Sequence, residues 1–255
     1  MTSDPPVELR LERMTWPEIR AALEAGYRSV VLPSGAIEQH GPHLPLLVDA
    51  DHADRLALEV AGRLGHVLVA PCIRIGHSPH HLAFSGTLSL GAATFESVYR
   101  DCCTSLAHHG FRRIYCFSAH GGNFAPLEDM GGRLKAAVGS ECEVIVFADL
   151  DAFLGTWRDV VEKRAGLGAA VGGHADVAET SVLAALHPEL VRWSRVQVGR
   201  TGGLDPDFLQ EALARGFDAF TPNGVLGDPH GASAELGEAC IQAVADLLAD
   251  YFRAA

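Results

Sequence analysis

Short apolar, β-branched runs alternate along this chain with longer segments whose apolar residues recur at helical spacing. Four runs are predicted to be strands, at residues 29–33, 67–70, 113–118 and 144–147. Helices are predicted over about 15–25, 52–64 and 94–109, after residue 123 up to about 138, and over 178–186 and 232–252. Strands that alternate with helices predict an α/β fold with a mainly parallel sheet covered on both faces.

Three polar loops follow predicted strands, one after Pro33, one after Ala70 and one after Ser118. In open parallel sheets, ligands bind beyond the carboxyl ends of the strands. We therefore expect polar groups that are distant in sequence to converge at this edge. The length of 255 residues fits a single domain, residues 1–255, since no repeat or linker divides the chain.

The first of these loops, residues 35–49, concentrates acidic and imidazole side chains. Glu38 and His40 lie two positions apart, and alternate side chains of an extended segment share one face. Asp49 follows a turn that contains glycine and proline. Any one of these residues alone is more typical of a capped loop or a satisfied buried polar group. Together they indicate a hydrolytic metal site.

His120 follows directly after a predicted strand, and Gly121 and Gly122 come next. Glycines there let the backbone approach a ligand or a metal with no Cβ in the way. A phosphate-binding loop is the competing interpretation. The loop has neither a GxGxxG nor a GxxxxGK[ST] pattern and lacks a lysine, which argues against it. A structural turn stays open as the alternative.

Residues 172–181 hold a third group, with His174 in a Gly-Gly loop and Glu179 near a helix start. The alternative for Glu179 is that its charge only complements the positive end of the helix. The candidate donors comprise two imidazoles and three carboxylates without a thiolate, namely Glu38, His40, Asp49, His120 and Glu179. Such a set suits Zn²⁺, Mn²⁺ or Fe²⁺.

Five ligands exceed the needs of one open tetrahedral site, so we consider two divalent ions bridged by Asp49. Three carboxylates against two ions leave one positive charge, which a bridging hydroxide neutralises. That hydroxide would be the nucleophile of a two-metal hydrolase, because bound metals lower the pKa of water.

The composition and charge of the chain limit the kinds of molecule that it could bind. The formal net charge is −12, from 20 basic and 32 acidic residues, and no basic run offsets it. Nucleic acid is therefore an unfavourable partner, and a small-molecule substrate is the default. The six cysteines form no C-x-x-C pair, which argues against a zinc ribbon or a thioredoxin-like site. Neither a secretory signal pattern nor an apolar run of membrane-span length is visible, so we expect a cytoplasmic protein without membrane contact.

In these motifs the chain resembles the creatininase family of metal-dependent amidohydrolases. The resemblance rests on E-Q-H-G-P-H-L-P followed by Asp49, on H-G-G-N at 120–123 and on H-A-x-x-x-E-T-S at 174–181, with further matches at 84–87 and 227–229. It implies a three-layer α/β/α sandwich, two divalent metal ions with Zn²⁺ foremost, and a homo-oligomer, often a hexamer.

The resemblance also implies individual roles. Glu38, Asp49 and His120 would hold one ion, and His40, Asp49 and Glu179 the other. His174 matches a family histidine that exchanges protons with the substrate. His81 matches a position that contacts substrate, with a satisfied loop histidine as the alternative, and Gly121 and Gly122 are expected beside the substrate.

One position departs from the name-giving enzyme, which has a metal-binding glutamate two residues after the histidine that His120 matches. This chain has Gly122 there. We therefore assign the ligand to Glu179 and expect a substrate other than creatinine.

The leading hypothesis is a dinuclear metal amidohydrolase that cleaves a C–N bond in a small cyclic or linear amide. One alternative is the peptide-trimming branch of the family, which matures a peptide-derived redox cofactor. A further alternative is a catalytically inactive, metal-stabilised binding protein.

Overall fold

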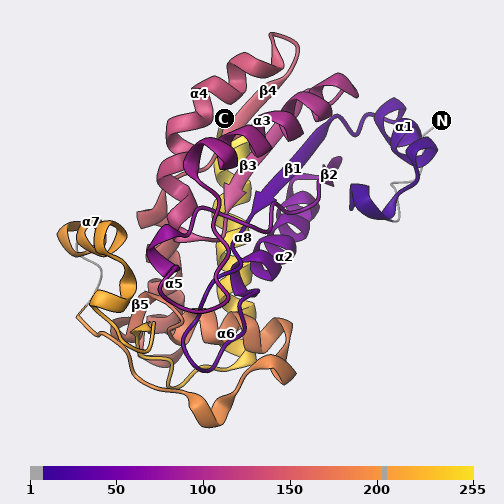
Figure 1. Cartoon of the computed structure of the whole chain (residues 1–255). Coiled ribbons are helices and arrows are strands. Elements are labelled where there is room, and N and C mark those ends of the chain that lie inside the picture. The colour runs from indigo at the N-terminus through magenta and orange to yellow at the C-terminus, as the bar shows by residue number, and fades with distance from the viewer. Residues whose placement is uncertain (1–7, 203–205) are drawn as a thin grey trace.

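A four-stranded parallel sheet forms the centre of the protein (Figure 1). The structure is a computed structural model that describes residues 8–202 and 206–255. The strand order is β2-β1-β3-β4, and every pairing in this sheet is parallel. The strands are β1 (Ser29–Ser34), β2 (Val67–Val69), β3 (Arg113–Ser118) and β4 (Glu143–Val146). All four lie where the apolar runs predict them, and the parallel sheet is confirmed.

Helices cover both faces of the sheet. The helices of the described residues are α1 (Trp16–Glu24), α2 (Val48–Leu64), α3 (Ala92–His108), α4 (Phe124–Val138), α5 (Leu150–Ala165), α6 (Val177–Leu186), α7 (Pro206–Arg215) and α8 (Ala234–Ala254). One core joins α2, α5 and α8 to one face through residues such as Leu56, Trp157 and Leu248. The other core joins α3 and α4 to the opposite face through Tyr99 and Leu127. The α/β/α class predicted from the sequence is thereby confirmed.

Helix α2 begins at Val48, earlier than the expected start near residue 52. Asp49 and Asp51 occupy its first turn, where negative charge interacts favourably with the partial positive charge of the helix N-terminus. Asp49 is therefore held on a helix and not on a flexible loop.

Several elements are not predicted by the sequence pattern. They are α5, α7 and a two-stranded antiparallel sheet of β5 (Val171–His174) and β6 (Leu226–Gly227). Strand β5 ends at His174, so this small sheet places that imidazole. Helix α7 lies at the periphery in Figure 1, far from α1. No helix in the described part of the chain is long and apolar enough to cross a membrane.

Candidate metal centre

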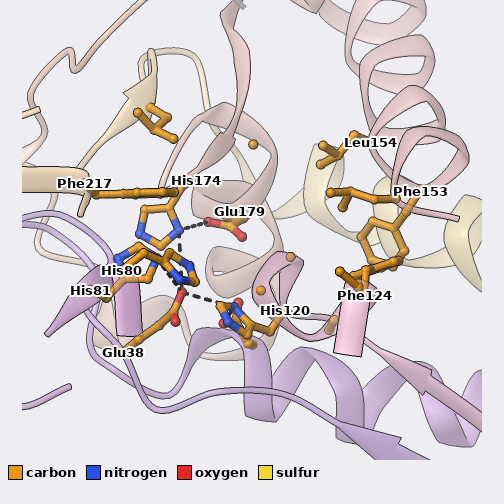
Figure 2. Close-up of a pocket in the computed structure, with 18 of the residues that line it drawn as sticks. Glu38, His80, His81, His120, Phe124, Phe153, Leu154, His174, Glu179 and Phe217 are labelled. Carbon is orange, nitrogen blue, oxygen red and sulfur yellow. Dashed lines mark ion pairs between the residues drawn. The ribbon is translucent and has the colours of Figure 1, made fainter. Parts of the chain in front are cut away.

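Polar side chains from separate elements meet at one cavity of about 240 Å³, beyond the carboxyl edge of the parallel sheet (Figure 2). The loops after β1 and β3, the first turns of α2 and α6, and the end of β5 supply them. Those that line the cavity are Glu38, Asp49, His120, His174 and Glu179. The remaining predicted metal ligand, His40, is fully buried and contacts Asp49 and Glu179.

Asp49 lies between two imidazoles, with one carboxylate oxygen toward each. Its Oδ1 is 3.1 Å from His40 Nε2, and its Oδ2 is 3.2 Å from His120 Nδ1. His120 Nδ1 is also 3.2 Å from Glu38 Oε1, and His40 Nε2 is 3.5 Å from Glu179 Oε2. The structure thus brings together all five side chains that the sequence offers as ligands.

Backbone and side-chain contacts fix the outward nitrogen of both imidazoles. His40 Nδ1 lies 3.1 Å from the Glu38 carbonyl oxygen, and His120 Nε2 lies 3.2 Å from that of His77. A neutral imidazole that donates to these carbonyls has an unprotonated nitrogen facing the carboxylates. Lone pairs then face lone pairs, an arrangement that requires a proton or a metal cation between them.

The buried carboxylate oxygens of Glu38 and Asp49 show whether this cluster fits a cation. Both carboxylate oxygens of Glu38 and Oδ2 of Asp49 are buried without a hydrogen-bond partner. Buried carboxylates without such partners are costly unless they are paired or bind a metal. Ligand atoms about 2.1 Å from one ion, at tetrahedral angles, lie about 3.4 Å apart. The observed spacings of 3.1 to 3.5 Å are close to this value. The residues present therefore fit divalent ions.

Neighbouring carboxylates and burial raise the pKa values of three residues in this cluster. Burial disfavours the charged form of His40, but Asp49 and Glu179 outweigh burial and raise its pKa to about 10. Burial likewise opposes charge on His120, whose pKa the Glu38 carboxylate raises well above the ordinary value. Burial raises the pKa of Glu179 to about 8. Protons and divalent cations would compete for these atoms.

Gln39 connects the cluster to two further histidines. Its side-chain amide nitrogen lies 2.8 Å from His81 Nδ1 and 2.9 Å from His174 Nε2, and it donates to the Gly224 carbonyl at 3.1 Å. His174 Nε2 also lies 2.8 Å from the main-chain carbonyl oxygen of Gln39. In the tautomer whose Nε2 donates to that carbonyl, the Nδ1 atom of His174 is unprotonated, and it lies 3.8 Å from Glu38 Oε1. Burial lowers the pKa of His174 and of His81 well below the ordinary value, so both are neutral.

The glycine pair after His120 has two different environments. A Cβ at Gly122 would lie 2.5 Å from His120 Nε2 and 2.6 Å from both the His77 carbonyl oxygen and His80 Cε1. The nearest atom to a Cβ at Gly121 is a Leu150 methyl at 4.0 Å. Both glycines line the cavity, but only Gly122 is required by close packing against a candidate ligand.

His80 is a candidate that the sequence did not single out as a site residue. It is buried, lines the cavity and stacks on His120 with ring centroids 5.7 Å apart. One group of potential ligand atoms comprises Glu38, His80 and His120, and a second comprises Glu38, His40 and His174. A third comprises His40, Asp49 and Glu179, the set expected for one ion.

Asn123 ties three loops of the site together. Its Oδ1 accepts from the His77 amide at 2.8 Å, and its Nδ2 donates to the Gly35 carbonyl and to Ser118 Oγ, each at 3.0 Å. These bonds link the loops that follow β1, β2 and β3. Asn123 thereby holds the loops that carry Glu38 and His120 in register.

The fold and this cluster define an α/β enzyme with a candidate metal centre. A family model described as creatinine amidohydrolase matches residues 12–252. The chain belongs to the creatininase family of hydrolases, as its motifs predict.

Relatives in this family have different described activities. A mycofactocin precursor peptide peptidase of Mycobacterium tuberculosis is 34% identical over 230 residues, covering 86% of this chain and 82% of that protein. A creatinine amidohydrolase of Pseudomonas putida is 32% identical over 259 residues, covering 94% and 95%. A solved structure of a creatinine amidohydrolase superposes with a TM-score of 0.76 at 29% identity, covering 97% of this chain and 99% of that chain.

Proposed function

We propose that this chain is a dinuclear metal-dependent amidohydrolase that cleaves a C–N bond in a small cyclic or linear amide. Glu38, Asp49 and His120 would hold one ion, and His40, Asp49 and Glu179 the other. The observation that carries the proposal is the position of Asp49, whose two oxygens face imidazole nitrogens 3.1 and 3.2 Å away. A carboxylate placed in this way can bridge two cations.

The chemistry of the donors guides the choice of metal. Imidazole and carboxylate without thiolate suit Zn²⁺ first, with Mn²⁺ and Fe²⁺ as alternatives. One solved creatininase structure, 27% identical to this chain, is described as a Zn-Zn type. Another, 28% identical, is described as a creatininase with Mn. The first structure supports a site for two ions, and the second supports Mn²⁺ as an alternative metal.

In the proposed reaction, bound ions would activate a water molecule and polarise the substrate carbonyl. The unprotonated Nδ1 of His174 would accept a proton from the attacking water and return it to the leaving nitrogen. The hydrogen bond between His174 Nε2 and the main-chain carbonyl of Gln39 would fix the ring orientation that this transfer needs. His81 Nε2 lies 3.2 Å from Glu38 Oε1, which places the His81 ring beside that carboxylate.

The test replaces His174 with glutamine and measures turnover of a panel of cyclic and linear amides alongside metal content. We expect kcat to fall about a hundredfold or more, as for loss of a general acid–base group, with metal content unchanged. His187→Gln is the matched control, since that half-buried histidine pairs with Asp51 and does not line the cavity. Undiminished turnover in His174→Gln would remove His174 from the mechanism.

A peptide-trimming activity is the second candidate. It is supported by 33% and 34% identity to mycofactocin precursor peptide peptidases over more than four-fifths of this chain. Cleavage of short peptides, together with no turnover of small cyclic amides, would favour this activity over the first.

Three other expectations accompany the proposal, namely a single domain, a cytoplasmic location and a homo-oligomer such as a hexamer. Light scattering after size-exclusion chromatography would measure the mass. A monomeric mass at micromolar concentration would contradict the assembly.

A further inference from the structure

Two of the site residues lie on one short turn. Strand β5 ends at His174, and Glu179 lies in the first turn of helix α6, which begins at Val177. Both side chains line the cavity, and Figure 2 shows them pointing toward each other, with His174 Nδ1 3.9 Å from Glu179 Oε2. The backbone of residues 174–179 therefore sets the separation between the proposed proton acceptor and a proposed metal ligand.

One buried carboxylate is bonded to the backbone on both sides of this turn. Asp176 is 0% exposed. Its Oδ2 accepts hydrogen bonds from the amides of Gly172 and Gly173, at 2.7 and 2.8 Å. Its Oδ1 accepts from the amides of Ala178 and Glu179, at 2.8 and 3.1 Å. Capping of helix α6 accounts for the second pair of bonds but not for the first pair, which hold strand β5.

The residue before Asp176 has an unusual backbone conformation. Ala175 has a φ of 52°, in the left-handed region that residues other than glycine rarely adopt. Its amide donates to Glu179 Oε2, so this residue also contacts the carboxylate of the proposed ligand. Such a conformation persists only where surrounding contacts hold it. The four hydrogen bonds of Asp176 lie on both sides of Ala175 and provide that constraint.

A glycine on the paired strand β6 makes room for Asp176. Gly227 has a φ of 107°, and a Cβ added there would lie 2.9 Å from Asp176 Cβ and 2.8 Å from the Gly172 nitrogen. It would also lie 2.5 Å from the Ala170 carbonyl oxygen. Gly227 opens the motif at 227–229, none of whose residues lines the cavity. Close packing against Asp176 explains the first residue of this motif.

We propose that Asp176 is a positioning residue, which fixes His174 relative to Glu179 through the backbone that carries them. This inference rests on the proposed function, in which His174 moves a proton and Glu179 holds an ion. Asp176 does not line the cavity, so it acts through these two residues and does not touch the substrate. Without its bonds to strand β5, the end of that strand is free to move relative to helix α6.

The test separates positioning from helix capping. Asp176→Asn keeps one side-chain oxygen, and asparagine caps helices as well as aspartate does, but its NH₂ group cannot accept the other two hydrogen bonds. Asp149→Asn is the matched control, because Asp149 caps helix α5 through a bond from the Ala152 amide within that helix. Leu134→Val is the control for lost stability, since Leu134 is buried in the core on the opposite face of the sheet.

We expect Asp176→Asn to lower kcat about tenfold or more with KM nearly unchanged, because the proton acceptor moves while the cavity lining stays the same. The substrate is the amide that the wild-type protein cleaves fastest. In competition with a fluorescent zinc chelator, the affinity for one ion should also fall about tenfold, since Glu179 serves only one of the two. Asp149→Asn and Leu134→Val should keep the wild-type kcat and affinities. The proposal is overturned if Asp176→Asn keeps the wild-type values, or if Leu134→Val loses them to the same extent.

Amide hydrogen exchange in the metal-free wild-type protein decides the matter if Asp176→Asn does not fold. Because one carboxylate holds both elements, the amides of Gly173 and Ala178 should open together and have equal protection factors. A Gly173 amide that is about tenfold less protected than that of Ala178 would overturn the proposal. This measurement needs neither metal nor turnover. Failure of the proposed function would appear instead as absent metal or absent amidase activity in the wild-type protein.

Discussion

The Nε2 atom of His40 lies 3.1 Å from Oδ1 of Asp49, although one residue belongs to the loop after β1 and the other to the first turn of α2. The second oxygen of Asp49 faces His120, in the loop after β3. This one carboxylate therefore joins three elements and contacts both proposed halves of the metal centre.

Replacing Asp49 with asparagine should lower metal content below one ion per chain and reduce amidase activity by about a thousandfold or more, because the amide cannot bridge two cations. Asp51→Asn is the control, since Asp51 lies in the same helical turn but pairs with Arg74 and His187. Elemental mass spectrometry and amide turnover measure both effects. Wild-type metal content in Asp49→Asn would show that Asp49 is not a bridging ligand.

The two glycines after His120 should respond differently to alanine. In Gly122→Ala the new methyl group would lie 2.5 Å from His120 Nε2, so the imidazole must move and metal affinity should drop at least tenfold. Gly121→Ala has open space and should bind metal as the wild type does. Competition with a fluorescent zinc chelator gives the affinities. Equal affinities in the two variants would mean that the His120 position is not constrained by Gly122.

The unpaired His52 should make the fold sensitive to acid. Burial lowers its pKa from 6.5 to about 4, so between these values the unfolded chain binds a proton that the folded chain does not. Stability should fall as pH decreases through this window, by about 2 kcal/mol at pH 5 from this group.

Urea unfolding of the chelator-treated protein at pH 7 and pH 5 measures this loss. His52→Phe keeps the ring stack on Trp157 but cannot titrate, so it should lose about 2 kcal/mol less than the wild type between the two pH values. His109→Gln, at an exposed histidine, should follow the wild type. Parallel losses in His52→Phe and the wild type would rule out His52 as the source.

Gln39 should affect catalysis more than metal binding. Gln39→Leu removes the donor to His81 and to the Gly224 carbonyl, and loosened orienting contacts typically cost about 10–100-fold in activity. We expect this loss in kcat with two ions retained. Gln242→Leu, at a helix α8 residue that pairs with Glu238, serves as the control. A Gln39→Leu enzyme with wild-type kcat would show that the Gln39 side-chain amide, 2.8 Å from His81 and 2.9 Å from His174, does not orient these histidines.

The strands and the loops that follow them could be predicted, because short apolar runs bounded by glycine and proline are a local signal. The convergence of Glu38 and His120 followed from the rule that ligands lie at the carboxyl edge of such sheets. Glu179 lies on α6, outside the loops of the parallel sheet, and its metal role was expected from the family resemblance. Helix α5 was not predicted, although Phe153, Trp157 and Val161 recur at four-residue spacing and are all buried.

Other features depend on contacts that sequence does not reveal. Gln39 reaches the Gly224 carbonyl across 185 positions, and only the folded chain shows this bond. Strand β5 contains Gly172 and Gly173, which have low β propensity, so its pairing with β6 is set by tertiary structure. The unpaired nitrogen of Trp157 likewise becomes visible only when its neighbours are known.

The central claim is tested most directly by the metal content per chain, measured by elemental mass spectrometry on protein purified without chelators or a metal-binding tag. The measurement is repeated after Zn²⁺ or Mn²⁺ is added and the excess is removed. The account predicts about two divalent ions per chain. No bound ion, even after metal is added back, would contradict it.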